Sequence, residues 1–188
     1  MKDYQKYKWF YTNSEKLVVG GKNAEQNEEL LKKFKELKED RIVMHTAQPG
    51  SPFSIIVADI DSIKSQDIEE AAIFTASFSQ EWKKKKKTSE IHIFNLSQLY
   101  KLKAMKAGTW GVKGKIKKIT VPLSLVLTKQ KSKLRAVPES SAKSFFLKII
   151  PGNIDKQQMV SKLQEILPSS FSKEDILSAL PAGGLSIK

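Results

Sequence analysis

The spacing of apolar positions near the start of the chain predicts a hairpin followed by a helix. Aromatic and branched residues over 7–19 flank a polar turn, a pattern typical of two antiparallel strands that end at Gly20-Gly21. Apolar residues then recur every three or four positions, so we expect a helix over about 24–38. Asn23 is the expected N-cap, because its side-chain oxygen can accept a free backbone N–H of the first turn.

Two short strands and a second helix are expected next. Residues 41–45 and 54–57 are apolar runs on either side of the turn Gln48-Pro49-Gly50-Ser51-Pro52, where proline and glycine interrupt the chain. Ser65 is expected to cap a helix whose apolar face extends to Trp82. Its acidic start and basic end suit the helix dipole.

From about residue 89 the apolar period shortens towards two, which predicts a strand-rich second half. Pro151-Gly152 is expected to break this part, Asp155 and Ser172 to cap two short helices, and residues 181–184 to fray. The expected strands lie at Ile91–Ile93, Val112–Val121, Leu123–Leu127 and Phe145–Ile150.

Strands and helices without regular βαβ alternation predict the α+β class, with a mostly antiparallel sheet, packed helices and a short helical C-terminal appendage. We expect residues 1–150 to form the main domain and residues 151–188 to be a C-terminal helical extension of that same domain.

The charge of the chain indicates which classes of partner it can bind. The 188 residues include 33 Lys and Arg against 20 Asp and Glu, a net charge of +13, and such a field favours polyanions, nucleic acid first and anionic membrane second. Only Arg41 and Arg135 are arginine, and lysine suits phosphates better than base edges. The absence of cysteine excludes disulfides, thiolate metal sites and thiol nucleophiles.

The lysines are clustered along the chain. Alternate residues of a strand share one face, so the spacing predicts basic stripes on a sheet. A solvated outer sheet face or helix end fits the same pattern, and both interpretations stay open. The clusters are Lys83, Lys84, Lys85, Lys86 and Lys87, then Lys113, Lys115 and Lys117, then Lys129, Lys131, Lys133 and Arg135.

Support for catalysis is thin. The two histidines do not belong to a metal-binding pattern, and no phosphate-binding loop, dinucleotide motif or nucleophile elbow is present. We therefore expect no enzyme activity, no metal and no cofactor. His92 lies between two strand isoleucines, which favours a structural or solvent-facing role. His45 ends a strand just before the Pro-Gly turn, so it is either a buried hydrogen-bonded histidine or a site residue.

Several segments form an ordered set of motifs. Residues 7–140 contain in turn Lys8-Trp9-Phe10, the run from Gly20-Gly21 through Asn27, the strand 41–46 with Pro49-Gly50-Ser51, the helix segment Glu70-Ala71-Ala72, and Gly108-Thr109-Trp110-Gly111. In this order they resemble the NFACT-R domain, the RNA-binding domain of the NFACT proteins of ribosome-associated quality control, in its stand-alone archaeal form. The chain has Pro52-Phe53 where many bacterial members have a second histidine.

The resemblance implies an RNA-binding module, with transfer RNA or ribosomal RNA as the ligand and the large ribosomal subunit as a further expected partner. It adds His45, Pro49, Gly50, Ser51 and Trp110 to the lysines as candidate RNA contacts. Trp110 is a stacking platform if exposed and a core residue otherwise. Motif positions expected to be structural are Trp9, Gly20, Gly21 and Asn27.

Two other classes of function remain open. The same lysines would serve a non-specific binder of DNA or of an anionic surface, and an enzyme centred on His45 is the third interpretation. The first residues lack an apolar signal segment and no segment is long enough to span a membrane, so a cytoplasmic protein without a membrane partner is expected.

Overall fold

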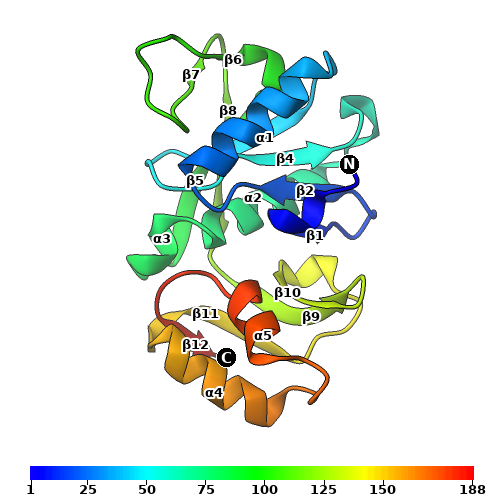
Figure 1. The fold of residues 1–188 in the computed structure, drawn as a ribbon, viewed down its shortest axis with the longest axis vertical. Coiled ribbons are helices and arrows are strands. Elements are labelled where there is room, and N and C mark those ends of the chain that lie inside the picture. Colours follow the sequence, from blue (N-terminus) through cyan, green and yellow to red (C-terminus); the bar gives the residue numbers. More distant parts are fainter.

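The molecule contains two large antiparallel sheets, a two-stranded sheet and five α-helices, and the computed structural model describes all residues 1–188 (Figure 1). The first sheet has six strands in the order β1-β2-β4-β3-β5-β8, the second has four in the order β10-β9-β11-β12, and β6 pairs with β7. The predicted α+β class with antiparallel sheets is confirmed.

The elements follow each other in this order and with these bounds: β1 Lys8–Tyr11, β2 Leu17–Gly20, α1 Ala24–Glu36, β3 Ile42–Thr46, β4 Ser54–Val57, α2 Ser65–Ser77, α3 Gln80–Lys83, β5 Thr88–Asn95, β6 Leu99–Tyr100, β7 Gly111–Val112, β8 Lys117–Pro122, β9 Leu125–Gln130, β10 Lys133–Val137, β11 Leu147–Ile154, α4 Lys156–Ile166, α5 Lys173–Ala179 and β12 Leu185–Ile187.

The first sheet is covered by one helix on each face, because successive strand residues point to opposite sides. Trp9 of β1 belongs to the cluster of 13 buried residues under α1, together with Leu30 and Leu31. Phe10, the next residue, lies on the other face and packs on Phe74 of α2 with 4.6 Å between ring centroids. Trp9 is therefore a core residue, only 1% exposed, and not a stacking platform.

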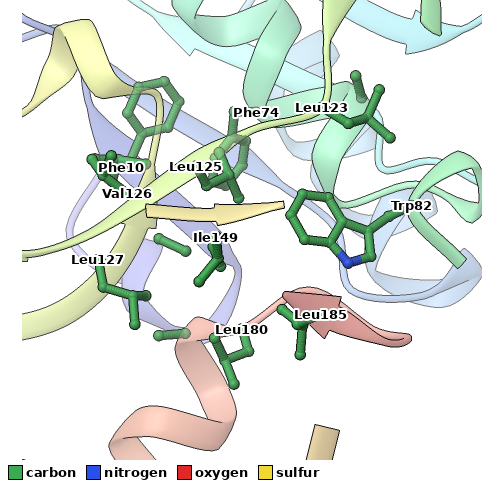
Figure 2. Close-up of a cluster of buried hydrophobic side chains, with 14 of the residues drawn as sticks. Phe10, Phe74, Trp82, Leu123, Leu125, Val126, Leu127, Ile149, Leu180 and Leu185 are labelled. Carbon is green, nitrogen blue, oxygen red and sulfur yellow. The ribbon is translucent and has the colours of Figure 1, made fainter. Parts of the chain in front are cut away.

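The second sheet and the first share one hydrophobic core. This core contains 30 buried residues, and Figure 2 shows Phe74 of α2 and Trp82 of α3 beside Leu125 and Ile149 of the second sheet. The indole N–H of Trp82 also donates to the carbonyl of Gly184, 3.1 Å away, near the C-terminus. The two sheets thus fold against each other as one packed body.

Side chains of the second sheet cover the free edge of β1. The amide of Gln130 accepts the backbone N–H of Tyr11 at 2.8 Å and donates to its carbonyl at 2.9 Å, as a neighbouring strand would. Arg135 donates through Nε to the carbonyl of Trp9 at 3.1 Å, and its guanidinium lies 4.5 Å from the centre of the Trp9 ring. This cover removes an exposed sheet edge that would otherwise invite pairing with another chain.

Most local predictions of the first half are confirmed, but the predicted second helix is divided, since α2 ends at Ser77 and Trp82 lies on the separate short helix α3. The hairpin, the first helix and the strands on either side of the Pro-Gly turn lie within one or two residues of their expected positions. Asn23 caps α1, because its Oδ1 accepts the backbone N–H of Gln26 at 2.8 Å. Asp155 and Ser172 cap α4 and α5 in the same way. Ser65, in contrast, is the first residue of α2, and Lys64 occupies the cap position.

Two predictions near the C-terminus are wrong. Pro151-Gly152 does not end the strand, since β11 continues to Ile154 and absorbs the irregularity as a bulge opposite Leu185. The tail after residue 181 is not frayed, because β12 pairs with β11 and Leu185 is fully buried.

The predicted basic stripes are also wrong. The expected strand over Val112–Val121 is divided into β7 and β8, so Lys113 and Lys115 lie on a loop that turns at Gly114, whose φ is +78°, and only Lys117 lies on a strand. The later group belongs to the β9–β10 hairpin, with Lys131 in its turn at a φ of 47° and Arg135 buried against Trp9. Alternation along one strand therefore does not align either group.

Candidate functional site

A cavity of about 620 Å³ opens beside β3, on the face of the first sheet that carries α1. Its walls come from the start of α1, the β3–β4 turn, the junction of α2 with α3, and the loop before β7. Aromatic rings and short polar side chains line it, with lysines from two elements. The lining residues include Gly21, Lys22, Asn27, His45, Pro49, Gly50, Ser51, Phe53, Gln80, Lys83, His92, Phe94, Gly108 and Trp110.

The β3–β4 turn has a fixed shape. The hydroxyl of Ser51 accepts the backbone N–H of Thr46 at 3.0 Å, and the carbonyl of Gly50 accepts the backbone N–H of Gln80 at 2.9 Å. Gly50 has a φ of +101°, and a Cβ added there would lie 2.4 Å from Cγ of Gln80. The backbone N–H groups of Gly50 and Ser51 make no hydrogen bond within the protein, and both residues line the cavity.

Asn27 of α1 holds the far side of this turn. Its Oδ1 accepts the backbone N–H of Phe53 at 3.0 Å, and its amide nitrogen donates to the carbonyl of Ser51 at 3.4 Å. Gly21 lets α1 come this close, since a Cβ on it would lie 2.3 Å from the same Oδ1. The motif residues Gly21 and Asn27 therefore shape the cavity wall.

His45 and His92 are direct cross-strand partners on β3 and β5, and both line the cavity. The His45 ring packs on Phe53, with 4.5 Å between ring centroids. Its Nδ1 lies 2.7 Å from the carbonyl of Thr46, and because a carbonyl only accepts, Nδ1 carries the proton and Nε2 keeps its lone pair. Burial lowers the pKa of His45, an effect that its hydrogen bond to Thr46 opposes and that nearby His92 strengthens. The ring is consequently neutral at neutral pH.

Hydrogen bonds to Glu28 of α1 hold the loop that carries Trp110. One carboxylate oxygen of Glu28 accepts the backbone N–H of Gly108 at 3.0 Å and the ammonium of Lys101 at 2.7 Å. Lys101 also donates to the carbonyl of Thr109 at 3.0 Å and lies 5.5 Å from the Trp110 ring centre. Burial alone would raise the pKa of Glu28, but hydrogen bonds from Lys101 and Gly108 outweigh it and lower that pKa.

The structure brings together only part of the predicted site. His45, Pro49, Gly50, Ser51, Lys83 and Trp110 line one cavity although they are far apart in the sequence. The other predicted lysines lie outside it and are exposed, and two of them have partners on the protein: Lys84 pairs with Glu81 and Lys85 donates to Asn153. Those outside are Lys84, Lys85, Lys86, Lys87, Lys113, Lys115 and Lys117; Trp9 and Gly20 also do not line the cavity.

Sequence reasoning missed three contributors to this site. His92 was expected to be structural or solvent-facing, Phe53 was only noted as a departure from bacterial relatives, and Glu28 was not singled out. The alternation of β5 put His92 on the face opposite Ile91 and Ile93, which is the cavity face. No local signal pointed to Glu28, because its partners lie 73 and 80 residues away along the chain.

No three His, Asp or Glu side chains gather closely enough to hold a metal ion. None of the helices combines the length and the apolar character needed to cross a bilayer.

One family model and two similar proteins emerge from comparisons with known proteins. Residues 6–114 match the family model described as the NFACT protein RNA-binding domain. An archaeal Rqc2 homologue, aRqcH, from Methanocaldococcus jannaschii is 29% identical over 98% of this chain, which spans 29% of the length of that relative. The C-terminal part of the fibronectin/fibrinogen-binding protein from Streptococcus suis has a similar fold, with a TM-score of 0.54 and 22% identity over 62% of this chain and 44% of that one.

Proposed function

The chain belongs to the family of NFACT protein RNA-binding domains, in its archaeal type, and on that premise we propose that it binds RNA through the cavity beside His45 and the lysines around it. One observation supports this choice of site most strongly. The motif residues His45, Gly50 and Trp110 come from three separate segments, and the fold gathers them around one opening.

The charges around the cavity suit an RNA backbone. Lys22, in the loop before α1, and Lys83, at the end of α3, both line the cavity, and the chain as a whole carries a net charge of +13. Lysines bind phosphates as mobile point charges with little sequence preference. Lys84–Lys87 follow Lys83 directly, so a strand of RNA that leaves the cavity along α3 meets a continuous basic segment.

The RNA we propose is a structured one, transfer RNA or ribosomal RNA, in ribosome quality control. The likeness to an archaeal Rqc2 homologue supports that context. We propose a cytoplasmic site of action and the large ribosomal subunit as a platform. Because the chain spans under a third of that relative, the activity of the longer protein is a separate question.

Binding without turnover fits the geometry best. The Nδ1–H of His45 is held by a backbone carbonyl and its Nε2 could accept a proton, but no serine, threonine or carboxylate side chain of the protein hydrogen-bonds this Nε2. The one carboxylate bonded to a histidine here, Glu90, contacts His92 at 3.0 Å and Lys118 at 3.4 Å, and its side chain is 44% exposed. We therefore propose a binding module.

The test is competition between folded RNA and duplex DNA of equal charge, with three variants. His45→Ala and Lys83→Gln should each weaken binding of a transfer RNA several-fold, while Lys162→Gln on the exposed face of α4 should not. Wild-type protein should prefer the RNA. Equal competition by DNA, with all three variants alike, would instead indicate a non-specific polyanion binder.

A further inference from the structure

We propose that the cavity receives a single unpaired nucleobase of the bound RNA, with Nε2 of His45 as a hydrogen-bond acceptor for that base. This inference rests on the proposed function and deepens it. The lysines contact phosphates, and the cavity distinguishes a base from bare backbone.

The size and walls of the cavity fit a flat aromatic ligand. Its volume of about 620 Å³ is within the range of small-molecule pockets, about 300–1,000 Å³. Phe53, Phe94 and Trp110 line it, and unstacked RNA bases bind proteins by stacking on such rings. A phosphate group, in contrast, gains nothing from apolar walls.

The state of His45 favours a base over a phosphate. The Nδ1–H is committed to the carbonyl of Thr46, so the ring offers only the Nε2 lone pair, and Nε2 makes no hydrogen bond within the protein. A lone pair repels phosphate oxygens, which are acceptors themselves. The amino and imino N–H groups on the edges of bases are the donors that it can accept.

Trp110 contributes a ring to the cavity rather than an available donor. Its indole Nε1 is buried and has no hydrogen-bond partner in the protein, although Trp110 lines the cavity. Because that N–H is closed off from solvent, it reaches a base only if the Trp110 ring turns, whereas the Nε2 lone pair of His45 is unused in the structure as it stands. The proposed base contact therefore rests on His45.

The experiment compares short RNAs that differ only in their bases. Ribo-octamers of A, C or U and an alternating G/U octamer are titrated against an abasic octamer with the same phosphates, at about 0.3 M salt to weaken backbone contacts. At least one octamer with bases should bind about fivefold or more tightly than the abasic one, as expected from one base stacked on an aromatic ring. Equal affinities for all octamers would overturn the proposal.

Two substitutions separate base recognition from backbone binding. His45→Phe keeps a ring against Phe53 but has no acceptor, so the advantage of the base should be lost while the affinity for the abasic octamer stays the same. His45→Gln places an amide near the position of Nε2 and should restore part of that advantage. A similar loss for both octamers in His45→Phe would make His45 a structural residue or a backbone contact.

Acidification gives an independent readout with a distinctive sign. Protonated His45 is a donor at Nε2, so the advantage of the base should fall as the pH is lowered through the pKa of His45, whereas a phosphate contact would strengthen. The titratable groups that line the cavity with His45 are His92 on β5, Lys22 before α1 and Lys83 on α3, and Glu90 pairs with His92. His92→Gln is the control that assigns the effect to His45.

Failure of this inference differs from failure of the proposed function. If the octamers bind equally and salt weakens all of them, RNA binding stands and the base site is wrong. If neither an octamer nor a transfer RNA binds even at low salt, both proposals fall together.

Discussion

At the scale of single residues, Gly50 determines the shape of the β3–β4 turn. Its φ of +101° disfavours any branched side chain, and a Cβ would collide with Gln80. Gly50→Val should lower the free energy of unfolding by about 1–3 kcal/mol, measured by denaturant titration. Gly114→Val is the control, because Gly114 also has a positive φ, +78°, but only one atom lies near, at 3.4 Å. Equal losses of unfolding free energy in Gly50→Val and Gly114→Val would show that the contact with Gln80 does not contribute to the effect.

The folded protein disfavours the charged form of Lys8. Burial, with repulsion from Lys156, Arg135 and Lys22, lowers its pKa from 10.5 to about 7, and its ammonium donates to the carbonyl of Ser178 at 2.8 Å. Between these two pKa values the unfolded chain holds a proton that the folded chain lacks, so the free energy of unfolding should rise with pH.

Thermal melts of the wild type and Lys8→Met between pH 7 and 9.5 test this expectation. The wild-type melting temperature should rise relative to that of Lys8→Met, and the two curves should be furthest apart at pH 7, where the buried charge costs most. Lys162→Met on α4 is the control for loss of an exposed charge. Parallel curves would show that Lys8 titrates normally.

At the scale of elements, the loop before β7 depends on α1 through Glu28. Glu28→Gln keeps the side-chain size but removes the ion pair with Lys101, so amide hydrogens over residues 101–110 should exchange faster. Stability should change little, by about 0–1 kcal/mol, since neither side chain is fully buried. Glu29→Gln, which removes the exposed pair with Lys6, is the control. Unchanged amide hydrogen exchange over residues 101–110 would show that Glu28 does not hold this loop.

The elements also differ in how well the sequence predicts them. The helix α1 could be placed because its Asn23 cap and its apolar spacing are local signals. Strand β12 could not be, because it depends on pairing with β11, and the Pro151-Gly152 pair that suggested a break is accommodated by a bulge. The motif at His45 and Gly50 likewise indicated one wall of the cavity. The position of Trp110 could not be predicted, because it depends on contacts of Glu28 with residues far away along the chain.

At the scale of the whole molecule, the two sheets depend on each other. Residues on both sides of position 150 share the core of 30 residues, and β11 crosses that position. The division into a domain of residues 1–150 and an extension of the same domain stays a proposal. The shared core implies that a fragment of residues 1–150 would not fold cooperatively, since β12 and its cover of β11 would be missing.

The charge of the whole molecule makes a quantitative prediction about salt. If five or six phosphates are neutralised, log affinity for a transfer RNA should fall with log salt concentration with a slope of about −4 to −5. Changing Lys83–Lys87 together to Gln should flatten this slope and leave the melting temperature nearly unchanged, because exposed charges contribute little to stability. An unaltered slope in a folded variant would identify the run as a solvated helix end.

The most direct test of RNA binding at the cavity is to locate the bound RNA. A transfer RNA carrying 4-thiouridine is bound to the wild-type protein, irradiated, and the crosslinked peptides are identified by mass spectrometry. Crosslinks should map to Trp110, to the strand and turn from His45 to Phe53, and to the segment Lys83–Lys87. Crosslinks confined to the second sheet and its helices, with the cavity peptides unmodified, would contradict the account.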